Sequence, residues 1–140
     1  MISATLDSSV FVRALHLGGP GALLIGHARA GNIRIDISVP ILDETMRVLR
    51  DKFQWNGYMI QDARGKLLSL SNCVSPTTQI SLIEEDPDDD RVLECAAAAK
   101  SDFIVTEDKD LLRVGQFGNA RIVTIRAFVK LALTHQIGPS

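Results

Sequence analysis

Acidic side chains gather in one short stretch of this chain and recur at three other places along it. Residues 84–91 read EEDPDDDR, so six of eight side chains are carboxylic acids, although 15 basic and 17 acidic residues leave the whole chain with a formal net charge of only -2. Elsewhere Asp7 follows ISATL, Glu44 lies within PILDETMRV, and Asp108 follows DFIVTE. Clustered carboxylates cannot all stay ionised without a compensating cation. Their chemistry therefore depends on whether the fold brings them together.

The acidic stretch has two interpretations. As the start of a helix, it would use Asp86 as N-cap, Pro87 as the first helical residue and Asp89 as the acid of a capping-box-like pattern. As a cation site, its hard oxygen atoms would suit Mg²⁺ or Mn²⁺. TEDKDLL is ambiguous in the same way, since Thr106 could be a helix cap with acids in the first turn. Neither pattern decides between the two by itself.

Segments typical of strands and helices alternate along the chain. ISATL is typical of a strand that ends at Asp7, and NIRIDISV alternates Ile33, Ile35 and Ile37 as a strand does. This alternation predicts one α/β domain over residues 1–140, with three layers and a central parallel sheet of about five strands. The other expected strands cover Cys73 and Val74, DFIVT and RIVT. Helices are expected in SVFVRAL, GALLIGHARAG, PILDETMRVLRDKF, residues 56–71, the stretch from the acidic run to Lys100, DKDLL and the segment after RIVT.

The predicted sheet gives the scattered acids a common location. In an open parallel sheet, ligands bind beyond the carboxyl ends of the strands. Asp7 and Asp108 follow two expected strands, Glu44 lies one turn into the helix after another, and the acidic run precedes the alanine-rich helix. We therefore expect these carboxylates to converge at one edge of the sheet, with Asp86, Asp90 and Asp110 as further candidates.

Four ordered segments resemble the motifs of PIN-domain ribonucleases, specifically the VapC-related toxins of toxin-antitoxin systems. The segments are LDSSVFVRAL, SVPILDETMRVLRDKF, DPDDDRVLECAAAAKSDFIVTEDKDLL and RIVTIRAFVKL, and the resemblance spans roughly residues 2–133. It implies a PIN-like α/β/α fold and a Mg²⁺- or Mn²⁺-dependent endoribonuclease whose products carry a 5′-phosphate and a 3′-hydroxyl. It also implies that the catalytic and metal-binding acids are Asp7, Glu44, Asp89 and Asp108.

The resemblance also assigns neighbouring residues. The family pattern reads DPxD, which favours Asp89 over Asp90 as the ligand and leaves Asp88 facing solvent. Thr106 and Ser9 match positions near the metals. Many members read DTN where this chain reads DSS, so Ser9 replaces an amide that could orient Asp7. Glu107 stands where glycine is common, and we expect it to point to solvent.

The expected partners follow from the proposed chemistry. They are an RNA substrate, an antitoxin protein and a second copy of the chain in a homodimer. A pI near 5.9 indicates no broad basic surface, so RNA binding should depend strongly on metal and salt. The basic residues expected to hold RNA are Arg13, Arg47, Arg50, Lys52 and Lys109.

Two further expectations concern the cell. No apolar run approaches the 18 or so residues of a membrane span, and the amino terminus does not resemble a signal peptide, so we expect a cytoplasmic protein. Cys73 and Cys95 are expected to be reduced, buried thiols.

The alternative function is a catalytically inactive PIN-like module that binds RNA or protein, which the presence of all four acids disfavours.

Overall fold

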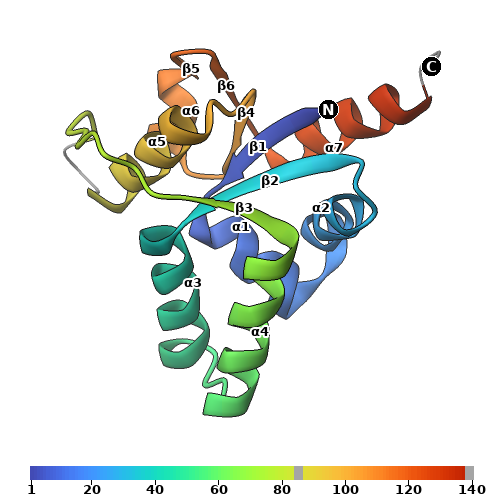
Figure 1. Cartoon of the computed structure of the whole chain (residues 1–140), viewed down its shortest axis with the longest axis vertical. Coiled ribbons are helices and arrows are strands. Elements are labelled where there is room, and N and C mark those ends of the chain that lie inside the picture. Colours follow the sequence, from blue (N-terminus) through green and yellow to red (C-terminus); the bar gives the residue numbers. More distant parts are fainter. Residues whose placement is uncertain (84–86, 138–140) are drawn as a thin grey trace.

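Strands and helices alternate along the chain as the sequence predicted (Figure 1). The computed structural model describes residues 1–83 and 87–137. In chain order the elements are β1 (Ile2–Leu6), α1 (Ser8–Val12), the π-helical segment η1 (Arg13–Leu17), α2 (Gly19–Arg29), β2 (Ile33–Ser38), α3 (Val39–Asp51), α4 (Gly57–Leu70), β3 (Ser71–Val74), α5 (Pro87–Ala99), β4 (Phe103–Val105), α6 (Lys109–Val114), β5 (Gln116–Phe117), β6 (Ala120–Val123) and α7 (Ile125–Ile137).

The described strands form one six-stranded sheet in the order β3-β2-β1-β4-β6-β5. All neighbouring pairs are parallel except β5 with β6. The predicted α/β class and parallel sheet are confirmed, with six strands in place of about five. The additional strand, β5, has two residues, which is too short to show the alternation that identifies a strand in a sequence.

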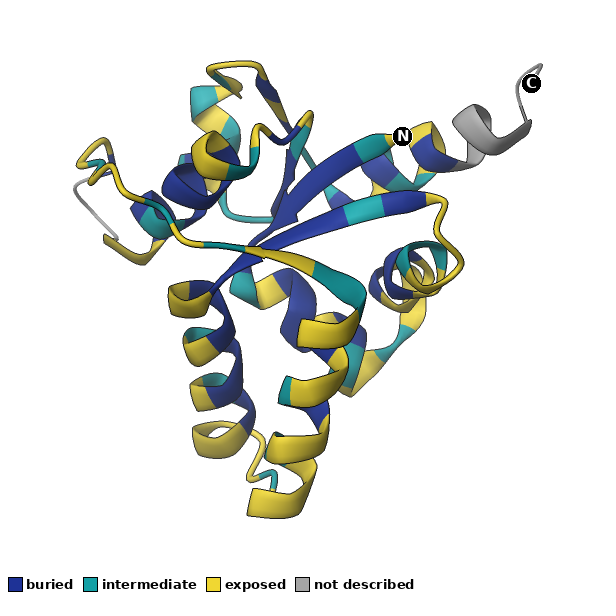
Figure 2. Ribbon diagram, in the orientation of Figure 1, coloured by how far each residue is buried: buried dark blue, intermediate teal, exposed yellow. Residues whose placement is uncertain are grey.

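Helices cover both faces of the sheet and make three layers. Figure 1 shows α1, α2, α3 and α4 on one side and α5 with α6 on the other. The central strands β1, β2 and β4 are mostly buried (Figure 2), and Leu6, Ile35 and Ile37 have no exposed surface. β1 lies at the centre of the order, so its carboxyl end, where Asp7 follows, is flanked by β2 and β4.

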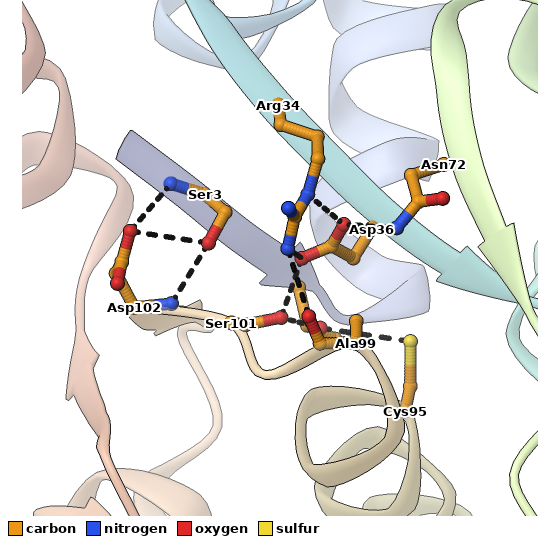
Figure 3. Close-up of polar contacts among 9 residues, drawn as sticks. Ser3, Arg34, Asp36, Asn72, Cys95, Ala99, Ser101 and Asp102 are labelled. Carbon is orange, nitrogen blue, oxygen red and sulfur yellow. Dashed lines mark hydrogen bonds and ion pairs between the residues drawn. The ribbon is translucent and has the colours of Figure 1, made fainter. Parts of the chain in front are cut away.

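The face of β2 under α5 carries a buried polar network (Figure 3). Asp36 has no exposed surface and accepts hydrogen bonds from Arg34 Nε at 2.8 Å, Asn72 Nδ2 at 3.0 Å and Ser101 Oγ at 2.6 Å. The Arg34 guanidinium also donates to the carbonyl of Ala99 at 2.8 Å. Since these groups belong to β2, β3 and the turn from α5 to β4, the network fixes the carboxyl end of α5 against the sheet. The other end of α5 carries the acidic run.

Two features concern the cysteines and membrane segments. Cys95 is buried as expected, and burial raises the pKa of its thiol to about 11. The expectation of a buried thiol was wrong for Cys73, which is exposed on the edge strand β3.

Within the described residues, no single helix is long and apolar enough to cross a membrane. The only described helix pair that is long and apolar enough when taken together is bent by 98°.

Asp36→Ala should lower the free energy of unfolding by about 3 kcal/mol, because it leaves the partners of a buried carboxylate without an acceptor. Urea denaturation measures this loss. Asp43→Ala is the control, since Asp43 pairs with Arg64 at the surface and its loss should cost less than about 1 kcal/mol. Equal, small losses for both variants would contradict a structural role for the network.

Candidate active site

Acids from four separate segments line one small cavity at the carboxyl edge of the sheet. The cavity measures about 120 Å³. All four acids that the sequence predicted as catalytic border it, so the expected convergence is present in the structure. Their function as metal ligands stays a prediction. The lining residues are Asp7, Ser8, Ser9, Glu44, Asp88, Asp89, Val92 and Asp108.

Asp7 is held in place from three directions. It is the N-cap of α1, and its Oδ1 accepts hydrogen bonds from the Val10 amide at 3.0 Å and from Ser9 Oγ at 2.5 Å. The Thr106 hydroxyl donates to Oδ2. Burial raises the pKa of Asp7, the hydrogen bonds oppose that rise, and the charge of Asp108 adds to it. The carboxylate is therefore oriented in advance, but its charge is disfavoured.

Thr106 couples the ends of β1 and β4. While its hydroxyl donates to Asp7, the same oxygen accepts from the Asp108 amide at 2.9 Å. Asp108 is the N-cap of α6, because its Oδ1 accepts from the Asp110 amide at 2.8 Å. The interpretation of Thr106 as the cap of this helix was wrong. Thr106 instead fixes the relative positions of two predicted catalytic acids.

Glu44 and Asp88 form a second carboxylate contact at the cavity. Glu44 is half-buried, and its pKa is raised first by burial and then by the charge of Asp88. A hydrogen bond with Asp88 raises it further, whereas a hydrogen bond from Ser8 and the charge of Arg47 lower it. Asp88 is exposed as expected, and it also lines the cavity, where the acidic run was expected to converge with the other acids. Ser8 lines the same cavity, a role that the sequence analysis missed although Ser8 directly follows Asp7.

Asp89 and Asp90 face different surroundings. Asp89 is buried at the cavity, and one oxygen each from Asp89, Asp108 and Asp110 lie within 4.8 Å of one another. Asp90 Oδ1 instead accepts from the amides of Leu82 and Ile83, at 2.9 Å and 2.8 Å. Asp90 therefore anchors the segment before the acidic run. The proposed cap Asp86 lies outside the described residues, and Pro87 is the first residue of α5.

Two departures from the family pattern have structural explanations. Ser9 donates directly to Asp7, so its hydroxyl orients the carboxylate as an amide could. Glu107 does not simply point to solvent as expected. Its Oε1 accepts from the Ile125 amide at 3.1 Å, which ties the segment after β4 to the start of α7.

Comparison with protein families finds a match to the PIN domain family over residues 3–110. This chain belongs to the PIN domain family. The region matched includes all four predicted catalytic acids, and the sequence-based recognition is confirmed. The fold of this PIN domain is similar to that of a chain in the crystal structure of VapBC2 from Rickettsia felis. In that structure VapBC2 is bound to a DNA fragment from the VapBC2 promoter. The TM-score is 0.61 at 16% identity, covering 88% of this chain and 98% of that one. A comparison with curated proteins finds no match.

Asp7→Asn should raise the Tm of metal-free protein by about 4 °C at neutral pH, equivalent to about 1 kcal/mol, because it removes a negative charge that burial disfavours and that the charge of Asp108 disfavours further. The raised pKa of Asp7 means that folding disfavours its ionised form. The resulting loss in the free energy of unfolding is complete above the raised pKa, and it disappears as the pH falls to 3.8, the ordinary pKa of an aspartate. The gain in Tm should therefore shrink on acidification.

The measurement is calorimetric or fluorescence melting in EDTA from neutral pH to about pH 4. Asp102→Asn is the control, since Asp102 accepts hydrogen bonds from Ser3 outside the acidic cavity and its loss should not stabilise the protein. A lower Tm for Asp7→Asn than for wild type at neutral pH would contradict the proposed cost of burying this charge.

Proposed function

We propose that this PIN domain is a metal-dependent endoribonuclease that acts as the toxin of a toxin-antitoxin pair. One observation carries the proposal: Asp7, Glu44, Asp89 and Asp108, from four separate segments, line a single cavity of about 120 Å³. A structural explanation accounts for Asp90, which binds backbone amides. It does not explain why four other acids share one cavity, where each disfavours the charge of the next.

The donor atoms fit a hard divalent cation. Oxygen atoms of Asp89, Asp108 and Asp110 approach one another within 4.8 Å, and carboxylates are preferred by Mg²⁺ and Mn²⁺. Asp89 and Asp108 of this group would hold the cation together with Asp7, which borders the same cavity. Asp110 is a further candidate, and Glu44 would contact the cation directly or through water. Such a cation supplies Lewis-acid chemistry, since it polarises a phosphoryl oxygen and makes water more acidic.

The residues of the chain have distinct tasks in this reaction. Ser9 and Thr106 hold Asp7 in one orientation, so its oxygen atoms need no rearrangement when the site fills. Glu44, with its raised pKa beside Asp88, is suited to holding a proton near the reacting water. Water adds to phosphorus, the bond from phosphorus to the 3′-oxygen breaks, and that oxygen takes up a proton. The products carry a 5′-phosphate and a 3′-hydroxyl.

The proposed partners are an RNA substrate, an antitoxin and a second copy of the chain. The similarity to VapBC2 supports an antitoxin, because that protein was determined as a VapB and VapC complex on promoter DNA. RNA as the substrate rests on the resemblance of the motifs to PIN-domain ribonucleases. The homodimer stays a prediction that light scattering can test.

Asp88→Asn, Asp89→Asn and Asp90→Asn give a matched set, because each removes one negative charge from the first turn of α5. Asp89→Asn should lower Mg²⁺-dependent cleavage of mixed RNA by about 100-fold or more, as expected for loss of a ligand. Asp90→Asn should retain cleavage, since an amide oxygen can still accept from Leu82 and Ile83. Asp88→Asn should lower this cleavage much less than Asp89→Asn does.

The pattern of losses distinguishes the alternatives. Equal losses for all three variants would indicate diffuse electrostatic attraction of the cation and would contradict a ligand at Asp89. Loss only at Asp90 would place the ligand one residue later. If wild-type protein cleaves no RNA with either Mg²⁺ or Mn²⁺, the inactive binding module replaces the nuclease.

A further inference from the structure

A second cavity, of about 360 Å³, lies between η1, the start of α2 and the start of α7. It is three times the volume of the acidic cavity, and its surface combines two kinds of group. Arg13 and Arg126 contribute guanidinium groups, and Leu17, Pro20 and Ile125 contribute apolar surface. A cavity of this composition suits a ligand that has both an anionic and an apolar part.

Both arginines are available to bind an anion. Within the described part of the chain, neither forms an ion pair with a carboxylate. Two other arginines that the sequence analysis assigned to RNA binding are already engaged: Arg47 pairs with Asp88 at 3.9 Å, and Arg50 pairs with Asp51 at 2.9 Å. Guanidinium groups bind phosphate oxygens with charge-assisted, often bidentate hydrogen bonds.

One carboxylate also borders this cavity. Glu107 accepts from the Ile125 amide, so its position is fixed by the start of α7. Two arginines and one glutamate leave the lining with a formal charge of +1. Among the residues that the structure describes, the lining of the acidic cavity has five carboxylates and no lysine or arginine. The two cavities therefore differ in sign.

Short connections link the basic cavity to the acidic one. Glu107 directly precedes Asp108, which lines the acidic cavity. Arg13 follows Asp7 by six residues through α1, which corresponds to about 9 Å along a helix axis. A nucleic acid strand at the acidic cavity would therefore have a neighbouring nucleotide within reach of Arg13.

We propose that the cavity between Arg13 and Arg126 binds a nucleotide of the RNA substrate next to the one that is cleaved. The two guanidinium groups hold its phosphate, and Leu17, Pro20 and Ile125 contact its ribose or base. This inference rests on the proposed nuclease function. An acidic peptide has the same charge as RNA, but a phosphodiester strand is favoured because the neighbouring cavity is the one suited to cleaving it.

The test measures binding of a short fluorescein-labelled RNA by anisotropy, with Ca²⁺ in place of Mg²⁺ to limit cleavage. Arg13→Ala and Arg126→Ala should each weaken binding by about tenfold, the loss expected for a charged hydrogen bond. Each should also reduce the slope of log affinity against log salt by about 0.7, the value for one phosphate contact on a single strand. Arg121→Ala is the control, because Arg121 is an exposed arginine outside the cavity, and it should change affinity by about twofold or less.

The outcomes separate this inference from the proposed function. If wild type cleaves RNA while all three variants bind it equally, the nuclease stands and the nucleotide site is wrong. If wild type cleaves no RNA but both cavity variants lose RNA binding relative to Arg121→Ala, the cavity is an RNA-binding site and the nuclease is wrong. If Arg13→Ala and Arg126→Ala bind RNA as wild type does but lose the binding of a polyglutamate peptide that wild type shows, the inference is overturned in favour of a protein ligand.

Discussion

The parallel pairing of β1 with β4 is the constraint on which the candidate site depends. It brings together the ends of two strands that lie about a hundred residues apart in the sequence, and the Asp7 amide donates to the carbonyl of Val105 at 3.1 Å. The Thr106 hydroxyl then connects Asp7 to the backbone of Asp108. Each acid also caps the helix that follows it. The same contacts thus start two helices and orient two carboxylates.

The arrangement concentrates charge where folding alone would disfavour it. Burial and neighbouring carboxylates raise the pKa of Asp7 and of Glu44, so the metal-free site is destabilising at neutral pH. The remainder of the domain must supply the stability that the site lacks. The Asp36 network contributes by fixing the far end of α5 to the sheet (Figure 3), and the packed strands contribute by burial. Such strain at a functional site, supported elsewhere, is common in enzymes.

Much of this organisation could be predicted from the sequence because its signals are local or periodic. The alternation of Ile33, Ile35 and Ile37 identified β2, and the order of the acidic motifs identified the family. Contacts between distant segments could not be predicted in the same way. The polar residues of β2 resemble a solvent-exposed face until α5 is placed over them, and the link from Asp88 to Glu44 depends on how α3 and α5 meet. The cap at Asp108 was missed because Thr106 is an equally good capping residue by type.

The central claim is that Asp7, Asp89 and Asp108 hold one divalent cation. Anomalous diffraction from crystals grown with Mn²⁺ tests it most directly, because the scattering identifies the metal and its ligands together. A manganese peak is expected within about 2.3 Å of carboxylate oxygen atoms from these three residues. No peak in that cavity at saturating Mn²⁺, or a peak bound only by acids elsewhere on the surface, would contradict it.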